Sequence, residues 1–328
     1  MLLTDIKNFL LENNYPSFRY KQIEKNYNSG RYNNFLEMSD LPKDLREILN
    51  EKFPYISVVE DKFQSELGTK KALLKLSDGL EIETVLMDYD QWITACLSTQ
   101  VGCSLNCQFC ATGKMGFKRN LTTEELLDQI RYWNIKIYPK YIGRIVFMGM
   151  GEPFLNYDNL LESLNHIDIG ARKISISTAG IIPKIIEFAN LKTQYNLAIS
   201  LHSVFQKTRE ELMPITKTYN LDELIKACHY YANTTNRQLF FEYALIKNVN
   251  DSQKDLDAVI NLLKSNKLFY LNIITLNPVK GSNLQPSDKL KLFETELTKK
   301  HINFSIRRSF GQKIDAACGQ LAYNTDIC

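Results

Sequence analysis

The chain has 328 residues, of which 44% are hydrophobic and 23% are charged, and its formal net charge is +3. This composition is typical of a globular protein and excludes a disordered or fibrous chain. A net charge so close to zero permits a nucleic-acid partner but does not require one.

The N-terminal segment shows none of the features of an export signal. Asp5 and Lys7 interrupt its apolar positions, and no small-residue cleavage site follows them. No apolar run approaches the ~18 residues of a membrane span. The seven cysteines are odd in number and clustered, which favours metal or catalytic use in a reducing compartment over disulfides. We therefore expect a cytoplasmic protein without a membrane segment.

Residues 1–55 are predicted to form short helices. Ile6, Phe9 and Leu10 recur at helical spacing, and no strand pattern interrupts the region. We expect a small N-terminal accessory domain.

Residues 56–90 change to alternating runs typical of strands. The runs at 72–76 and 80–86 are separated by Ser-Asp-Gly at 77–79, a sequence that favours a turn. A β-hairpin that links the helical region to the rest of the chain is predicted here.

Residues 91–328 form the third region, in which strand-like and helix-like segments alternate. Strands are predicted at 92–98, 144–148, 173–177, 196–201, 238–245, 270–276 and 303–307. Helices are predicted at 123–137, 159–166, 183–190, 221–232, 251–264 and 288–300. Thr122 and Glu125 have the spacing of a capping box at the first of these helices. Such alternation predicts βαβ units and a parallel sheet.

We expect an α/β fold in which this sheet forms a partial (β/α)6-type barrel rather than an open, doubly wound sheet. The reason is that several predicted strands end in small or polar clusters. These are GMGE at 149–152, STAG at 177–180, SLHS at 200–203 and NP at 277–278. Because parallel barrels build their active sites at the carboxyl ends of their strands, the clusters predict a polar rim around a cofactor.

Cys103, Cys107 and Cys110 fall within the segment CSLNCQFC, just after the first predicted strand of the barrel. Structural zinc sites and ordinary iron–sulfur clusters use four protein ligands. Three thiolates leave one position of a [4Fe–4S] cluster open to a small molecule, as catalytic metal sites do. The alternative is a zinc site completed by a distant histidine or by Cys96.

The three-cysteine spacing resembles the radical S-adenosylmethionine (SAM) superfamily. Four further segments resemble, more narrowly, the RlmN/Cfr family of radical SAM RNA adenosine methyltransferases. They are CLSTQVGC at 96–103, GMGEP at 149–153, SLH at 200–202 and IDAACGQL at 314–321. The resemblance covers nearly the whole chain, and it implies a radical SAM barrel with an RNA-binding N-terminal domain.

The resemblance also implies residue roles. Cys103, Cys107 and Cys110 would hold the [4Fe–4S] cluster, whose open iron takes the amino and carboxylate groups of SAM. The family's SAM-binding positions correspond to Gly151, Glu152, Ser177, Ser200, Leu201, His202 and Asn277. Cys318 and Cys96 match its two catalytic cysteines, and Glu83 matches its proton acceptor.

By the same resemblance, each turnover uses two SAM molecules. One methylates the sulfur of Cys318, and the other yields a radical that takes a hydrogen from that methyl group. The methylene radical adds to adenine, Glu83 removes the ring proton, and Cys96 attacks the sulfur of Cys318 to release the product as a disulfide forms. Carbons 2 and 8 of adenine are too weakly nucleophilic to attack SAM directly, so the cofactor carries the difficult step. Release by exchange requires two thiols within reach.

The expected activity is methylation of carbon 2 of an adenosine in 23S ribosomal RNA, and also in transfer RNA. The expected partners are these RNAs and an electron donor such as flavodoxin or ferredoxin, and the expected state is a monomer. Pro153 favours carbon 2, because the related enzymes that modify carbon 8 usually carry alanine there. Carbon-8 methylation of the Cfr type stays open. So do a radical SAM enzyme acting on protein or a metabolite, and a non-enzymatic, metal-containing RNA-binding protein.

Plainer interpretations exist for several of these residues. Cys96 and Cys318 could be small core residues. Glu83, on an alternating strand, could be a solvated outward carboxylate. His202 could be a structural histidine, and Gly151 could serve only a tight turn.

Overall fold

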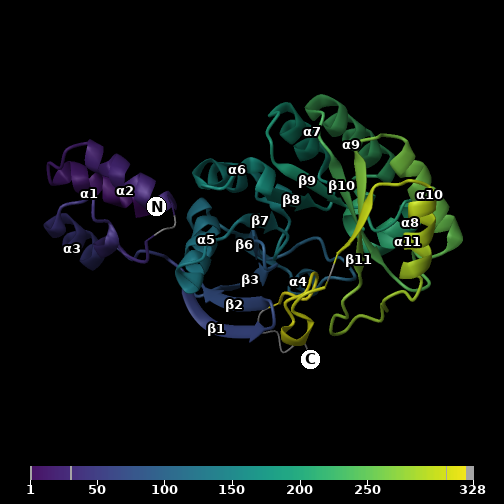
Figure 1. The fold of residues 1–328 in the computed structure, drawn as a ribbon, viewed down its shortest axis with the longest axis horizontal. Coiled ribbons are helices and arrows are strands. Elements are labelled where there is room, and N and C mark those ends of the chain that lie inside the picture. Colours follow the sequence, from purple (N-terminus) through teal and green to yellow (C-terminus); the bar gives the residue numbers. More distant parts are fainter. Residues whose placement is uncertain (1, 30–31, 308, 323–328) are drawn as a thin grey trace.

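The computed structural model describes residues 2–29, 32–307 and 309–322, which form a small helical lobe and a larger α/β lobe (Figure 1). The helical lobe contains α1 (Leu2–Glu12), α2 (Phe18–Ser29), the 3-10 turn η1 (Phe35–Glu37) and α3 (Lys43–Lys52). Its buried apolar side chains, among them Ile6, Ile23 and Leu45, form a hydrophobic core of their own. The helical character predicted for residues 1–55 is thus present.

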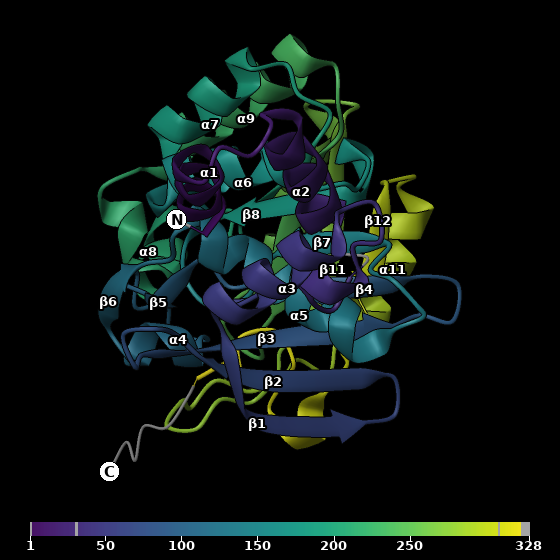
Figure 2. The same ribbon diagram turned by 90° about the vertical axis from the view of Figure 1, so that its left-hand side faces the viewer.

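An antiparallel unit follows, made of β1 (Val59–Glu66), β2 (Thr69–Lys75) and β3 (Glu81–Asp88). The predicted hairpin corresponds to β2 and β3. The sequence did not predict β1, because its residues VEDKFQSE are mostly polar and exposed, as an edge strand permits. The unit is also not a separate linker in space, since β3 pairs with β4 and continues the main sheet (Figure 2).

The remaining strands of this ten-stranded sheet are all parallel to one another. In chain order they are β4 (Ile93–Cys96), β7 (Arg144–Phe147), β8 (Ile174–Thr178), β9 (Asn196–Ser200), β10 (Leu239–Leu245), β11 (Phe269–Thr275) and β12 (Phe304–Arg307). Their order in the sheet is the same as their order in the chain. A doubly wound sheet reverses direction at a switch point, whereas a barrel does not. With β1 and β12 at its two edges, the sheet is a partial barrel, as predicted.

Helices fill the connections between the parallel strands. The predicted ones are α5 (Thr123–Ile137), α6 (Tyr157–His166), α7 (Ile182–Asn190), α9 (Leu221–Thr235), α10 (Gln253–Lys264) and α11 (Leu290–Lys299). The capping box of α5 is confirmed: the Glu125 N–H donates to Thr122 Oγ1 at 3.2 Å, and the Thr122 N–H donates to the Glu125 carboxylate at 2.9 Å.

Several short elements were not predicted, because they are too brief to show a period. They are β5 (Gln100–Gly102), α4 (Ala111–Lys114), β6 (Phe117–Asn120), α8 (Gln206–Leu212) and the 3-10 turns η2 (Pro153–Leu155), η3 (Ala171–Lys173), η4 (Pro214–Lys217) and η5 (Gln312–Ile314). Among the residues that the structure describes, no helix is long and apolar enough to cross a bilayer.

The two lobes meet at α5 through buried charged and aromatic side chains. The guanidinium of Arg131 lies 3.6 Å from the centre of the Tyr27 ring. The Tyr27 hydroxyl donates to Glu124 Oε1 at 2.9 Å, and Arg131 pairs with Asp128 at 2.7 Å and also with Glu124. Since these groups are desolvated, their mutual contacts offset the cost of burying them.

Candidate active site at the carboxyl ends of the strands

The three clustered cysteines lie on the loop between β5 and α4, which follows β4, the first parallel strand of the barrel. Cys103 is buried, and Cys107 and Cys110 are half-buried. Burial raises the pKa of Cys103 to about 12, and burial together with the neighbouring thiols raises the pKa of Cys107 well above its usual value. Thiols of this kind stay protonated until a metal displaces the proton.

The donor set consists of three thiols on one loop. Within the described residues, no three or more His, Cys, Asp and Glu side chains converge as ligands of one metal ion. The thiolates of a [4Fe–4S] cluster bind separate irons, so they surround the cluster rather than meet at a point. Three thiols on one loop fit three of its irons and leave the fourth open. The Phe109 ring within this loop packs edge-on against His202, with ring centres 4.5 Å apart.

Glu152 lies on the loop after β7 and is hydrogen-bonded to the loop after β8. It is 4% exposed, and its carboxylate accepts N–H groups from Ala179 at 2.7 Å and from Phe154 at 3.0 Å. Burial raises the pKa of Glu152 to about 7, and these hydrogen bonds oppose the rise. Gly151 before it has φ +97°, and a Cβ there would lie 2.5 Å from Gln100 Cβ. The turn therefore requires glycine.

His202 lies at the end of β9, after half-buried Ser200 and buried Leu201. Its Nδ1 accepts the Ala244 N–H at 2.9 Å, so its proton is on Nε2. Burial lowers the pKa of His202 to about 3, which keeps the ring neutral. Its ring packs against the cysteine loop. Ser177, on β8, is half-buried.

Arg209 on α8 ties these strand ends together. Its Nη2 donates to the carbonyls of Ala179 at 2.7 Å and Ser200 at 2.9 Å, and its Nε donates to that of Leu201 at 3.1 Å. Its Nη1 donates to Thr216 Oγ1 at 2.6 Å. The sequence analysis missed this residue, because α8 is short and an arginine in a helix usually faces solvent.

The C-terminal segment, residues 311–322, crosses beside the cysteine loop and carries Cys318; it is the yellow coil next to α4 in Figure 1. The Ala111 N–H donates to the Gly319 carbonyl at 2.7 Å, and Thr112 Oγ1 donates to that of Leu321 at 2.6 Å. Asn277 Nδ2 donates to the Cys318 carbonyl at 3.1 Å. Asn277, predicted to bind a cofactor, here holds the backbone of the segment.

Cys96 ends β4, and the fold brings it near Cys318. Neither residue is in a disulfide among the residues that the structure describes. Burial and the Cys318 thiol raise the pKa of Cys96 to about 12. Cys318 is exposed, yet protein surrounds it closely enough that desolvation raises its pKa to about 11. Arg307 opposes the rise in both thiols.

Arg307, at the end of β12, belongs to a polar group inside the barrel that the sequence analysis missed. Its Nη2 pairs with Glu242 Oε1 at 2.9 Å, and its Nη1 lies 3.2 Å from Met148 Sδ. Asn272 Nδ2 donates to the same Glu242 oxygen at 2.9 Å. The signal was a polar residue within each of two otherwise apolar strands, LFFEYAL and FYLNIIT.

Glu83 is buried on β3, so the interpretation as a solvated outward carboxylate is wrong. It is 5% exposed. Lys71 Nζ lies 2.7 Å from its Oε1, and the Ala322 N–H donates to its Oε2 at 2.8 Å. Burial raises the pKa of Glu83, and the charge and hydrogen bond of Lys71 oppose that rise. Glu83 thus lies against the segment that carries Cys318.

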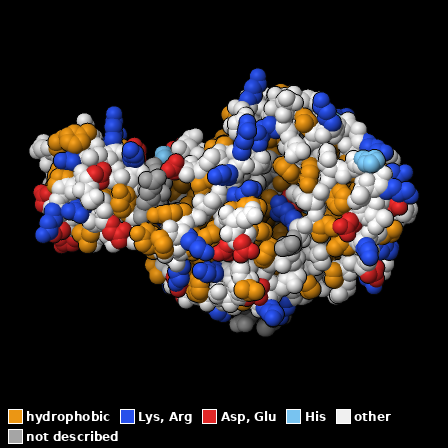
Figure 3. Space-filling view, in the orientation of Figure 1, with side chains coloured by type: hydrophobic (Ala, Val, Ile, Leu, Met, Phe, Trp, Pro, Cys, Tyr) orange, Lys and Arg blue, Asp and Glu red, His pale blue; other side chains and the backbone are white. Residues whose placement is uncertain are grey.

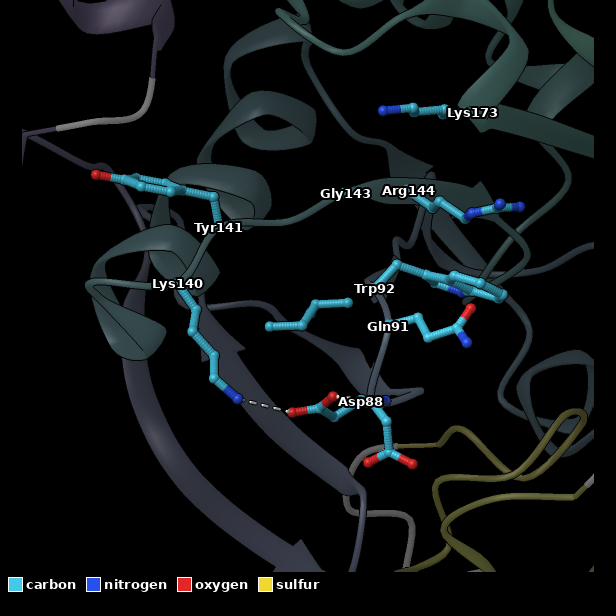
Figure 4. A pocket seen from close by; sticks show the side chains of 10 residues that line it. Asp88, Gln91, Trp92, Lys140, Tyr141, Gly143, Arg144 and Lys173 are labelled. Carbon is cyan, nitrogen blue, oxygen red and sulfur yellow. Dashed lines mark hydrogen bonds and ion pairs between the residues drawn. The ribbon is translucent and has the colours of Figure 1, made fainter.

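The larger lobe is hollowed near its centre in the orientation of Figure 1, with a basic side chain at the border (Figure 3). A separate cavity of about 470 Å³ lies at the amino ends of β4 and β7 and is lined by Trp92, Lys140, Tyr141 and Arg144 (Figure 4). Lys140 pairs there with Asp88 at 3.3 Å, and Arg144 covers the Trp92 ring at 4.3 Å. Because the cysteines and Glu83 are not among its lining residues, the candidate chemistry belongs to the carboxyl ends of the strands.

Comparison with known proteins points to one family. A model of the Radical SAM superfamily matches residues 97–263. A probable dual-specificity RNA methyltransferase RlmN of Clostridium botulinum (strain Eklund 17B / Type B) is 42% identical, over 97% of this chain and 94% of its own. A protein of the same name from Listeria monocytogenes is 41% identical, over 97% and 91%. The crystal structure of a radical SAM methyltransferase from Sphaerobacter thermophilus superimposes with a TM-score of 0.89 at 37% identity, covering 98% of this chain and 97% of its own.

Proposed function

This chain belongs to the RlmN family of radical SAM RNA methyltransferases, and on that premise we propose that it methylates carbon 2 of an adenosine in 23S ribosomal RNA and in transfer RNA. Membership makes it an enzyme that uses SAM and an iron–sulfur cluster, so the interpretation as a non-enzymatic binding protein is set aside. The names of the relatives, dual-specificity RNA methyltransferases, support two RNA substrates.

The observation that carries the proposal is that Cys96 and Cys318 lie near each other and near the cysteine loop. These thiols come from the first strand of the barrel and from the C-terminal segment, yet the Cys318 thiol raises the pKa of Cys96, and Cys110 of the loop acts on Cys318. A methyltransferase that only delivered a methyl group from SAM would need neither. A transfer through a sulfur-bound carbon needs both, one to carry the carbon and one to release it.

In the proposed site, Cys103, Cys107 and Cys110 hold a [4Fe–4S] cluster. SAM lies along Gly151, Glu152, Ser177, Ser200, Leu201, His202 and Asn277. When bound, the cluster and two molecules of SAM per turnover supply the methyl carbon and the radical that activates it.

The chain's own residues then perform the transfer. Cys318 carries the methyl carbon on its sulfur and joins it to the adenine ring. Glu83 accepts the proton of the attacked carbon. The Cys96 sulfur then attacks that of Cys318, so that a sulfur–sulfur bond forms as the sulfur–carbon bond breaks; the departing carbon keeps the electron pair and takes a proton to become the methyl group. An external reductant restores the two thiols before the next turnover.

The three regions of the chain have different proposed tasks. Residues 1–55 bind RNA, residues 56–90 supply the base Glu83, and residues 91–328 form the catalytic core. We further propose a cytoplasmic monomer that receives electrons from a donor such as flavodoxin or ferredoxin.

The test is anaerobic incubation of the reconstituted enzyme with SAM, a reductant and RNA that lacks the modification, followed by mass spectrometry of the nucleosides. We expect 2-methyladenosine with the wild-type enzyme and none with Cys318→Ala. With Cys96→Ala, we expect enzyme and RNA to remain covalently joined. Cys228→Ala is the matched control, because this cysteine is fully buried in α9 and the proposed reaction gives it no role. Formation of 8-methyladenosine would assign the chain to the carbon-8 group instead.

A further inference from the structure

Lys71 is a buried lysine to which the proposed reaction gives no role. It lies on β2, and 6% of its surface is exposed. A buried ammonium is costly unless close partners offset its desolvation. Its Nζ lies 2.7 Å from Glu83 Oε1 and donates to the Asp315 carbonyl at 3.3 Å. Both partners therefore belong to the surroundings of the candidate site.

The β2–β3 register explains why Lys71 and Glu83 meet. Leu73 is paired with Glu83, and Lys71 with Val85, so Lys71 and Glu83 are diagonal neighbours on one face of the hairpin. The hairpin formed by β2 and β3 makes two hydrogen bonds with the C-terminal segment. Lys71 donates to the Asp315 carbonyl, and Glu83 accepts from the Ala322 N–H. The two contacts lie before and after Cys318 in the chain.

Among the groups around Glu83, Lys71 does most to favour the ionised form of the Glu83 carboxyl group. Burial raises the pKa of Glu83, and the nearby Asp315 carboxylate raises it further. Lys71 is the cation that opposes them, with a smaller contribution from the Ala322 N–H. The neighbours on other strands and loops are uncharged: Ser98 Oγ donates to the Glu83 carbonyl, and Met150 Sδ accepts its N–H. Without Lys71, the pKa of the carboxyl group would rise further, because burial and Asp315 would then be opposed only by the Ala322 N–H.

We propose that Lys71 is a positioning residue for the proton-transfer step. It keeps Glu83 ionised, orients the Glu83 carboxylate, and holds the segment that carries Cys318 against Glu83. In that step the carbon–hydrogen bond at the attacked adenine carbon breaks. Its proton goes to a Glu83 oxygen, and its electron pair stays with the adduct of RNA and enzyme. The unpaired electron that the radical addition leaves on the adduct would return to the iron–sulfur cluster. Lys71 neither gives nor takes a proton. The inference rests on the proposed function, because Glu83 acts as the base only in that reaction.

The test compares Lys71→Gln with the wild-type enzyme from pH 6 to pH 9.5, with Lys75→Gln as the matched control because Lys75 is an exposed residue of the same strand. Methylated nucleoside, methylated Cys318 and covalent RNA adduct are measured together. For Lys71→Gln, we expect product formation at pH 7 to fall by roughly ten-fold or more and the adduct to accumulate, while methylation of Cys318 is unchanged. The apparent pKa of product formation rises, so activity returns at high pH. Glu83→Gln blocks the same step without that return.

Hydrogen exchange of the protein without cofactors gives a readout that does not depend on activity. In Lys71→Gln, the amides of residues 311–322 exchange faster, whereas Lys75→Gln leaves them unchanged. If Lys71→Gln does not fold, Lys71→Arg tests the proposal instead. Because arginine keeps the positive charge, we expect the apparent pKa of product formation to stay at the wild-type value while the rate of product formation falls. A rise of that pKa in Lys71→Arg would overturn the proposal.

Two kinds of failure are distinguishable. If the wild-type enzyme makes no methyladenosine on any RNA, the proposed function is wrong, and the role of Lys71 in this reaction is wrong with it. If the wild-type enzyme makes it and Lys71→Gln has the same rate, pH profile and hydrogen exchange, only the role of Lys71 is wrong.

Discussion

Arg209 is the side chain that joins the carboxyl ends of β8 and β9. Its guanidinium donates to three backbone carbonyls and one hydroxyl in a buried setting. Burial lowers the pKa of Arg209 to about 10, which still leaves it charged at neutral pH. The planar fork of arginine matches this spread of acceptors, and the single ammonium of lysine does not.

We expect Arg209→Lys to lower the free energy of unfolding of the larger lobe by on the order of 3 kcal/mol, because it leaves buried carbonyls without donors. Urea denaturation followed by the fluorescence of Trp133, which is buried in α5, measures the loss. Lys207→Gln is the control, since Lys207 is an exposed residue of the same helix, and it should change the free energy by less than about 0.5 kcal/mol. Equal stability of Arg209→Lys and the wild type would contradict this role.

Individual residues differed in how far the sequence predicted them. The polar strand ends marked Glu152, Ser200 and Asn277 in advance, because a parallel barrel brings such ends to one mouth. Lys71 and Arg209 were missed, since isolated basic residues usually face solvent and only the folded chain shows their burial. The register of the predicted hairpin contained the signal for Lys71, as a charge diagonal to Glu83.

Among the elements, the long periodic segments were predicted well and the short ones were not. All seven predicted strands and all six helices of the barrel region are present. β1 and β5 escaped prediction for different reasons: β1 is a polar edge strand, and β5 has three residues. Short elements are held by tertiary contacts rather than by a periodic pattern.

Helix α2 is fixed to α5 by Tyr27, which is fully buried. Its ring contacts Arg131 and also packs against Phe35 and Tyr55 of the helical lobe. Tyr27→Ala removes the ring and leaves a cavity, so we expect the helical lobe to lose roughly 3 kcal/mol or more. Tyr27→Phe removes only the hydroxyl group's bond to Glu124, which is worth about 1 kcal/mol.

Hydrogen exchange measured separately over α1–α3 and over β7–β12 tests this prediction. Tyr27→Ala should accelerate exchange in the helices and leave the parallel strands protected, because the two lobes have separate hydrophobic cores. Equal acceleration in both lobes would show that they unfold as one unit.

The division of the molecule into two cores has a consequence for RNA. The helical lobe contains none of the proposed cofactor or catalytic residues, and it touches the barrel through α5. On α2, Lys21 is exposed and Arg19 and Tyr20 are half-buried, a combination suited to phosphates and bases. If this lobe reads RNA, removing it should separate substrate binding from the chemistry that occurs on Cys318.

We therefore expect a chain that lacks residues 1–55 to methylate Cys318 from SAM at the wild-type rate, but to form methyladenosine roughly ten-fold more slowly or worse, because contacts to phosphates are lost. Mass spectrometry of protein and nucleosides from one reaction measures both events. The full-length double variant Arg19→Gln/Lys21→Gln is the control for damage by truncation, and it should show the same separation in weaker form. If the truncated enzyme modifies RNA as fast as the full chain, the barrel itself recognises the RNA, and the helical lobe needs another explanation.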